Sequence, residues 1–230
     1  LIPHLKHLRE SGVRLFLMTN SNHHYTNVLM RYAYGADWRS LFDLIIYRSK
    51  KPQFFLLNTP FSCITDATLP GETKGVREMD DSEPLQIGGE YYGGNLRKLK
   101  NDLLGDSEVT YVGDELFGDV VAPTSYAQWA TIAVVEELQE AEELAGWKHP
   151  KSEIRLEQTA ANLSLSNWGN YFICAGQPTR LTFYGALMHH FADVAIPCVS
   201  RLAHFEAGDL FLPHHPHAQE GATRDSDLKH

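Results

Sequence analysis

Cysteine is scarce in this sequence. Only three cysteines occur among 230 residues, Cys63, Cys174 and Cys198, and they lie far apart without a CxxC spacing. An odd, scattered set of this kind is typical of reduced thiols and argues against a disulfide framework. We therefore expect a cytoplasmic protein.

Basic residues are outnumbered by acidic ones. Lys and Arg number 20 against 29 Asp and Glu, which gives a net charge of −9 with neutral His. A nucleic-acid-binding surface needs a basic patch, often with interleaved aromatic residues, and none appears. No apolar run approaches the roughly 20 residues that span a bilayer. The sequence thus predicts neither nucleic acid nor a membrane as a partner.

The first residues lack two familiar features. The chain begins Leu1-Ile2-Pro3-His4, without Met and without the basic start and apolar core of a secretory signal. Two interpretations fit, a fragment of a longer protein or a natural short form, and the missing Met favours the fragment. A mitochondrial address would then lie upstream of Leu1, and that location stays open.

Apolar residues at helical spacing alternate with short apolar runs in the first 50 residues. Helices are expected around residues 2–10 and 28–34, and strands over Val13–Met18 and Phe42–Tyr47. Strands that alternate with helices predict an α/β fold, here a Rossmann-like parallel sheet with right-handed crossovers. We assign this core to residues 1–148.

Residues 53–92 interrupt the alternation. Phe54–Leu57 is expected to be a strand, and the polar stretch 65–83 is rich in Asp, Glu, Gly and Pro. This pattern is typical of a β-hairpin excursion from the sheet edge with a mobile tip.

The alternation then resumes. A helix is expected to begin at Gly93-Gly94-Asn95, followed by a strand over Val109–Val112, a helical stretch over 119–126 and a last core strand at Thr131–Val135. Further on we expect an acidic helix at 136–144, a linker at 149–168, a C-terminal helical extension at 169–213 packed on the core, and a disordered tail at 214–230.

Polar side chains follow three of the expected strands. Thr19-Asn20-Ser21 closes the first, Lys51 follows the second, and Asp114 and Asp119 follow the strand at Val109–Val112. In an open α/β sheet, ligands bind just past the carboxyl ends of the strands. Hydroxyl and backbone N–H groups donate to phosphoryl oxygens, a lysine offsets their charge, and carboxylates hold a hard cation such as Mg²⁺.

Each of these residues also has a purely structural interpretation. Asp114 and Asp119 fit an N-cap and a solvated loop acid, Thr19 fits a helix N-cap, and Lys51 fits a surface lysine. The pair His23-His24 is interpreted as part of a loop rather than as a contact to substrate.

The order of these motifs, their spacing and their local sequences are more specific than any single residue. On these motifs the sequence resembles the haloacid dehalogenase superfamily, and within it the cytosolic purine 5′-nucleotidase group with its 5′-nucleotidase domain-containing relatives. The matching segments are residues 15–21, 42–46, 51–55, 92–94, 111–119, 177–181 and 188–193.

The resemblance implies a role for each matching residue. The Thr19 hydroxyl would bind the transferring phosphoryl group, with Asn20 and Ser21 beside it, and Lys51 would stabilise nucleophile and phosphate. Asp114 would coordinate Mg²⁺, and Asp119 would be the second acid of the same motif. In such enzymes an aspartate attacks the phosphorus of a nucleoside 5′-monophosphate, and a second aspartate serves as acid and base.

The chain departs from the family at the nucleophile. The family's Asp-x-Asp motif, on a first strand, should precede residue 1. Asp225-Ser226-Asp227 fits the same pattern, but it lies in a polar tail and follows no apolar strand. The sequence therefore predicts the C-terminal part of a Mg²⁺-dependent 5′-nucleotidase-like phosphatase, inactive on its own. The alternative is a non-catalytic nucleotide-sensing or scaffold member, and a homo-oligomer stays open in either case.

Overall fold

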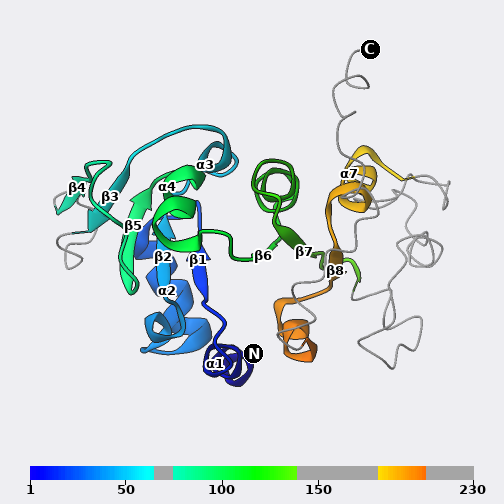
Figure 1. The fold of residues 1–230 in the computed structure, drawn as a ribbon. Coiled ribbons are helices and arrows are strands. Elements are labelled where there is room, and N and C mark those ends of the chain that lie inside the picture. Colours follow the sequence, from blue (N-terminus) through cyan, green and yellow to red (C-terminus); the bar gives the residue numbers. More distant parts are fainter. Residues whose placement is uncertain (65–74, 139–180, 206–230) are drawn as a thin grey trace, which may run out of the picture.

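A computed structural model describes residues 1–64, 75–138 and 181–205 (Figure 1). These residues form an α/β fold with two sheets in which most neighbouring strands are parallel. The strands are β1 (Phe16–Met18), β2 (Leu44–Tyr47), β3 (Phe61–Ile64), β4 (Val76–Glu78), β5 (Gly89–Gly93), β6 (Thr110–Gly113), β7 (Ala130–Val134) and β8 (Val194–Ile196). The helices are α1 (Ile2–Glu10), α2 (His23–Tyr34), α3 (Gln53–Leu56), α4 (Leu96–Leu99) and α7 (Phe183–Phe191), with short helical turns η1 (Trp38–Leu41), η2 (Lys100–Leu104), η3 (Leu116–Val121), η4 (Pro123–Ala127) and η5 (Val199–His204).

The larger sheet has five strands in the order β1-β2-β5-β3-β4. β1, β2 and β5 run parallel, with Met18 opposite Ile46 and Ile46 opposite Tyr91. β3 and β4 form an antiparallel hairpin, and β3 pairs antiparallel with β5. The predicted hairpin is therefore confirmed as the edge of the sheet, while its predicted tip lies outside the described residues.

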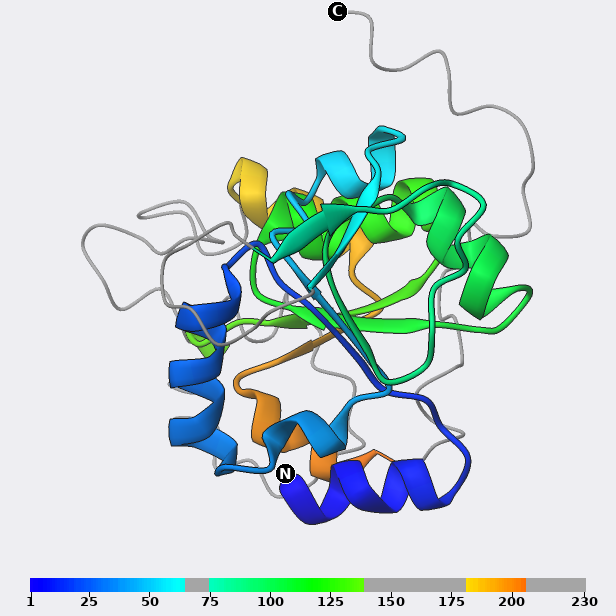
Figure 2. The same ribbon diagram turned by 90° about the vertical axis from the view of Figure 1, so that its left-hand side faces the viewer.

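The smaller sheet has three parallel strands in the order β6-β7-β8. Ile132 of β7 lies opposite Val112 of β6 on one side and Val194 of β8 on the other. The turns of η3 and helix α7 pack on one face of this sheet through Leu116, Val120 and Met188. Leu202 of η5 packs on the other face, where Leu1 reaches it, and Figure 2 shows η5 close to α1.

Strand β2 shows how the larger sheet is buried on both faces. Ile45 and Tyr47 face one cluster together with Trp38 of η1, while Leu44 and Ile46 face the other together with Phe54 and Phe61. All four β2 residues are buried, as expected for a parallel strand covered by helices on both sides. The sheet is thus a rigid base for the loops that leave its strand ends.

The two sheets meet at β1 and β6. Each is an edge strand of its own sheet, and the two lie next to each other (Figure 1). The Tyr111 hydroxyl of β6 is 3.4 Å from the Met18 carbonyl oxygen of β1, and the rings of Phe16 and Tyr111 are 6.3 Å apart. Side chains, rather than backbone hydrogen bonds, join the two edges.

The structure differs from the sequence-based expectations in four places. His23 and His24 are the first residues of α2, so their interpretation as part of a loop is wrong. Residues 53–56 form helix α3, so the expected strand at Phe54–Leu57 is wrong. Strand β5 joins the larger sheet between β2 and β3, where no parallel strand was expected. The C-terminal segment 181–205 belongs to the expected helical extension, but it also contributes strand β8 between α7 and η5.

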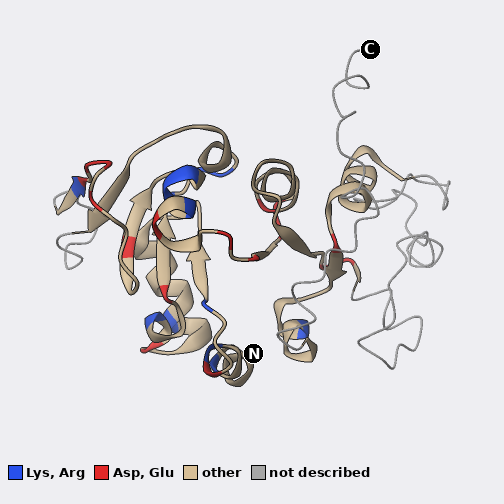
Figure 3. Ribbon diagram, viewed as in Figure 1, with Lys and Arg blue, Asp and Glu red and all other residues tan. Residues whose placement is uncertain are grey.

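Several predictions fall outside the described residues. They are the linker at 149–168, the tail at 214–230 and most of the acidic helix at 136–144. Among the described helices, none is long and apolar enough to cross a bilayer. In Figure 3, Lys and Arg lie mostly on the larger sheet and its helices, whereas the described residues from β6 to η5 contain several Asp and Glu but only one Lys or Arg, Arg201.

Candidate functional site

The loop after β1 begins at Thr19 and ends at the start of α2. The Thr19 N–H donates to the Ile46 carbonyl oxygen at 2.9 Å, which continues the pairing with β2, and its hydroxyl oxygen accepts from the Ser21 N–H at 3.1 Å. The N-cap of α2 is Asn22, whose side chain accepts from the Tyr25 N–H. Thr19 is therefore not the helix cap, and one of its structural interpretations is wrong.

Asn20 connects this loop to the turn that carries Lys51. Its side-chain oxygen accepts from the Lys51 N–H at 2.7 Å and from the Ser49 hydroxyl at 3.0 Å, and its amide donates to the Lys51 carbonyl oxygen at 3.1 Å. Both ends of the amide thus hold the Lys51 turn in place. The predicted contact between Asn20 and phosphate stays a prediction.

The Lys51 side chain is 9% exposed, so it is not the surface lysine of the structural interpretation. Its Nζ lies 2.5 Å from Asp119 Oδ1, 2.8 Å from the Tyr111 hydroxyl and 3.4 Å from the Met18 carbonyl oxygen. Since Met18 directly precedes Thr19, the ammonium group is held at the carboxyl end of β1. The structure therefore brings together residues from β1, the turn after β2 and the loop after β6.

Two glycines allow Asp119 and Lys51 to come this close. A Cβ atom at Gly113 would lie 2.5 Å from the Asp119 side chain, and a Cβ atom at Gly118 would lie 2.9 Å from Lys51 Cβ. Real Cβ atoms do not approach other atoms so closely, so both positions need glycine while the pair keeps this arrangement. The sequence analysis missed these residues, although both precede an aspartate in the same short motif, Gly113-Asp114 and Gly118-Asp119.

Asp119 is buried at the start of η3. Its second oxygen, Oδ2, accepts from the Glu115 N–H at 3.2 Å, and the Glu115 side chain caps η3 by accepting from the Phe117 and Gly118 N–H groups. Glu115, rather than either aspartate, is thus the cap of this helical turn. The buried ion pair with Lys51 also rules out Asp119 as a solvated loop acid.

Asp114 lies directly after β6 and differs from Asp119 in every respect. Its side chain is exposed, and it forms no ion pair within the described part of the chain. An exposed carboxylate at a strand end offers its oxygens outward, which suits a hard cation. Thr19 and Asp114 each directly follow a strand, β1 and β6, that the Lys51 side chain contacts.

Tyr111 is a further member of the site that sequence reasoning missed. Burial, together with the nearby Asp119 carboxylate, raises the pKa of its hydroxyl well above the usual value of 10.0. The hydroxyl therefore stays protonated, accepts from Lys51 and keeps its proton for the Met18 carbonyl oxygen or Asp119. Its signal in the sequence is only the aromatic residue before Val112-Gly113-Asp114.

The chemistry of the donor set is compatible with a magnesium ion, although no group of three His, Cys, Asp or Glu side chains forms among the described residues. Mg²⁺ keeps several waters and is usually held by one or two carboxylates plus substrate phosphate. One exposed carboxylate at the end of β6, together with the predicted phosphate loop at the end of β1, would fit that pattern. Asp114 would therefore be a ligand that needs partners from phosphate, water or residues elsewhere.

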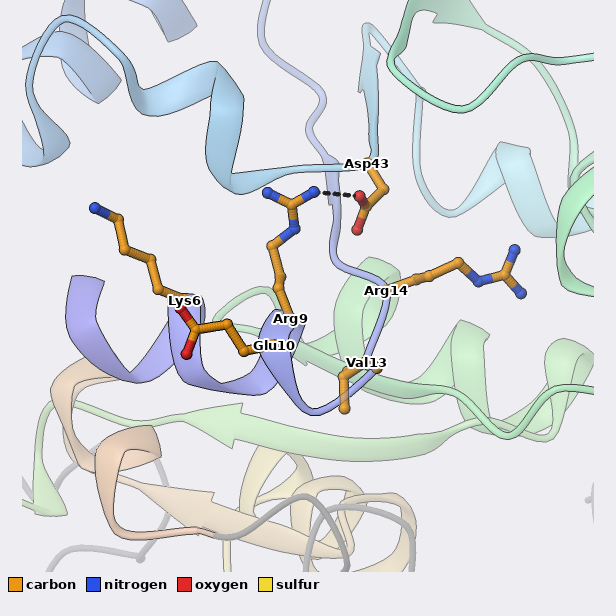
Figure 4. A pocket seen from close by; sticks show the side chains of 7 residues that line it. Lys6, Arg9, Glu10, Val13, Arg14 and Asp43 are labelled. Atoms are coloured by element: carbon orange, nitrogen blue, oxygen red, sulfur yellow. Dashed lines mark hydrogen bonds and ion pairs between the residues drawn. The ribbon is translucent and has the colours of Figure 1, made fainter.

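A hollow of about 400 Å³ lies at the opposite end of the strands (Figure 4). Arg9 in this hollow is paired with Asp43 at 2.6 Å, and Lys6 and Arg14 point away from each other. Its charged groups do not converge on one point, so it is a weaker candidate than the strand-end site. It is lined by Lys6, Arg9, Glu10, Gly12, Val13, Arg14 and Asp43.

The same strand-end residues lie within the part of the chain that matches a known family. A sequence model described as the 5′ nucleotidase family matches residues 1–164. The chain belongs to the 5′ nucleotidase family. This membership confirms the resemblance noted from the motifs, and the haloacid dehalogenase superfamily is consistent with it.

Individual relatives are named as 5′-nucleotidase domain-containing proteins. The chain is 28% identical over 227 residues to 5′-nucleotidase domain-containing protein 1 of Bos taurus, covering 86% of this chain and 46% of that protein. It is 29% identical over 189 residues to the protein of the same name from Homo sapiens, covering 74% and 39%. A 5′-nucleotidase domain-containing protein of Dictyostelium discoideum is 31% identical over 140 residues, covering 57% and 23%.

The matches therefore span less than half the length of these curated relatives. Family membership supports a nucleotidase or phosphatase kind of function, and it suggests a metal-dependent enzyme.

Proposed function

We propose that this chain is the C-terminal part of a Mg²⁺-dependent phosphatase that hydrolyses nucleoside 5′-monophosphates. The observation that carries the proposal is the position of Lys51 Nζ, which is buried at the carboxyl end of β1 and 2.5 Å from Asp119. A cation held at a strand end between a hydroxyl-bearing loop and an exposed carboxylate is what a transferring phosphoryl group needs.

Each residue of the site has a chemical task in this proposal. The Thr19 hydroxyl and the N–H groups of the loop through Ser21 would donate to phosphoryl oxygens. Lys51 would offset the charge that develops on them, and Asp119 with Tyr111 keeps its ammonium group in place. Asp114 would hold the magnesium ion, which when bound neutralises phosphate charge.

The nucleophile would come from outside the chain. An aspartate on a preceding strand would attack phosphorus, the nucleoside oxygen would leave with a proton, and water would then release phosphate from the aspartyl phosphate. The facing edges of β1 and β6 support this, since among the described residues neither edge pairs with another strand and only side-chain contacts join the two. An additional strand there would end beside Lys51.

A non-catalytic nucleotide-sensing or scaffold role is the alternative. The observation that favours it is the Lys51–Asp119 pair, because a closed, charge-neutral pair needs no substrate to balance it. Such a member would bind a nucleotide at the same loops without turning it over.

Phosphate release from inosine and guanosine 5′-monophosphate, measured with Mg²⁺, tests the proposal. We expect release by the full-length protein, none by residues 1–230 alone, and loss of release in full-length Asp114→Ala. Nucleotide binding by the full-length protein without release would favour the sensing role. Release by residues 1–230 that survives Asp114→Ala would contradict both the upstream nucleophile and the role of Asp114.

A further inference from the structure

His23 is a buried histidine at the first residue of α2, two residues after the loop that ends at Ser21. Its side chain is 7% exposed, and its Nε2 atom lies 2.9 Å from a terminal nitrogen of Arg39. A guanidinium group can only donate hydrogen bonds, so Nε2 must accept. The ring is therefore neutral and carries its proton on Nδ1.

Arg39 carries this contact onward to the sheet. Its Nε donates to Glu90 of β5 at 2.9 Å, and the Tyr47 hydroxyl of β2 donates to the other Glu90 oxygen at 2.6 Å. A further Arg39 nitrogen donates to the Asn27 side chain of α2 at 2.9 Å. Arg39 thus holds α2 at two points, His23 and Asn27, and anchors both to β5.

The backbone at the same position is also fixed to the sheet. The His23 N–H donates to the Tyr92 hydroxyl of β5 at 3.3 Å, and the His23 ring lies 5.2 Å from the Tyr47 ring at 80°. The chain from Thr19 to His23 is therefore short and held at both ends, by β2 at Thr19 and by Arg39, Tyr47 and Tyr92 at His23. Between these ends, the Ser21 carbonyl oxygen also accepts from the Arg48 N–H at 2.9 Å, so the contacts of His23 are one of several restraints on the loop N–H groups.

We propose that His23 is a positioning residue for the phosphate-binding loop, and that it performs this task only as a neutral acceptor for Arg39. The inference rests on the proposed function of the Thr19–Ser21 loop and adds pH sensitivity to it. His23 itself does not touch the phosphate; it fixes the start of α2, and through it the loop.

Protonation of His23 would place its Nε2–H donor against the Arg39 N–H donor, so their hydrogen bond would be lost. The groups that face the ring are Arg39 from η1, Glu90 and Tyr92 from β5, Tyr47 from β2 and His24 from α2 itself. Glu90 lies 4.0 Å from Nε2 and could accept a hydrogen bond from the protonated ring. However, it already accepts hydrogen bonds from Arg39 and Tyr47. Burial and the positive charge of Arg39 lower the pKa of His23, with Glu90 opposing them, so the neutral form is the native one. Acid would then loosen the loop.

Three variants of the full-length protein test this role, His23→Leu, His23→Gln and the control His24→Leu. The readout is the affinity for inorganic phosphate with Mg²⁺, measured by calorimetry at about pH 5 and about pH 8. Because phosphate itself titrates in this range, each variant is compared with the wild type at the same pH. In parallel, ¹⁵N NMR reports the ring tautomer and the backbone signals of Thr19, Asn20 and Ser21.

At the higher pH we expect His23→Leu to weaken phosphate binding by about tenfold, the size seen when a supporting contact behind a binding group is lost. His23→Gln keeps an acceptor for Arg39 that cannot be protonated, so it should bind like the wild type at high pH and better than the wild type at low pH. His24→Leu should bind like the wild type at the higher pH, where both rings are neutral and the contact of His23 with Arg39 is intact.

Equal affinities of His23→Leu and His24→Leu would overturn the inference, as would an Nε2-protonated ring in the wild type. Failure of the proposed function is a separate result, in which the wild type neither binds phosphate nor releases it from nucleotides. Even then the NMR signals decide the positioning role: shifts of Thr19–Ser21 with pH in the wild type that His23→Gln abolishes support it, and their persistence in His23→Gln contradicts it.

Discussion

The loops after β1 and after β6 use their polar side chains in different ways. In the loop after β1, Asn20 is used inside the protein, where both ends of its amide hold the Lys51 turn. In the loop after β6, Asp119 is buried in an ion pair while Asp114 five residues earlier is exposed. One loop therefore offers hydroxyl and N–H donors on a fixed frame, and the other offers a single carboxylate.

This difference shows how one lysine serves both loops. Lys51 is held by its backbone to the first loop through Asn20, and by its ammonium group to the second through Asp119. A side chain fixed at both ends loses little additional freedom when a ligand binds, which is the advantage of a preorganised site. If this comparison is right, substitution of Lys51 should lower the free energy of unfolding more than a substitution in either loop alone.

Replacing Lys51 is expected to have the largest effect on stability. Lys51→Met leaves the Asp119 carboxylate buried without its cation, which costs about 3 kcal/mol or more of the free energy of unfolding. Lys50→Met is the control, because Lys50 is the exposed neighbour and should cost at most about 0.5 kcal/mol. Urea unfolding measures both, and equal losses would show that Lys51 and Asp119 are not a coupled pair.

Gly113→Ala should come next. Its Cβ would lie 2.5 Å from the Asp119 side chain, so Asp119 must move away from Lys51, at a cost of about 1–3 kcal/mol. Gly118→Ala meets the flexible end of Glu115 at 2.7 Å and Lys51 Cβ at 2.9 Å, so part of its strain can relax. Unfolding free energies in which Gly118→Ala costs clearly more than Gly113→Ala would argue against Asp119 as the constrained member of the pair.

Asp114→Asn should leave stability unchanged within about 0.5 kcal/mol, because the side chain is exposed and forms no ion pair among the described residues. In the full-length protein it should raise the Mg²⁺ concentration needed for half-maximal phosphate release by at least about tenfold, since a hard cation loses a charged ligand. The Mg²⁺ titration of this variant separates the open carboxylate from the buried one. An unchanged Mg²⁺ dependence would remove Asp114 from the metal site.

Much of this site could be predicted from the sequence because one topological rule is strong. Thr19, Lys51 and Asp119 are far apart in the chain, but each follows an apolar run, and parallel strands bring such positions to one edge. The α/β class followed from the alternation of helical segments with short apolar runs along the chain. The inference of the strand-end site and that of the α/β class used only the order and the apolar character of short segments, which can be read directly from the sequence.

The missed features depend on distances that no pattern in the sequence displays. Tyr111 is inside a strand, and only the fold shows that its hydroxyl reaches Lys51. Strand β8 is three residues long within an apolar stretch that also fits a helix, and α3 follows Pro52 in a run too short to separate helix from strand. Short apolar segments of this kind take their structure from their neighbours rather than from their own residues.

The smallest expected effect concerns the pH dependence of stability at His23. Because burial lowers the pKa of this residue in the native state, the unfolded chain binds its proton first as the pH falls below the ordinary value of 6.5. Stability from the neutral ring is therefore fully present above that value and is lost as the pH falls toward the lowered native pKa. His23→Gln should show a shallower loss of unfolding free energy between about pH 8 and pH 5 than the wild type. Since burial is the main cause, added salt should leave the wild-type slope largely unchanged, and a slope that salt abolishes would assign the effect to exposed charges instead of the buried ring.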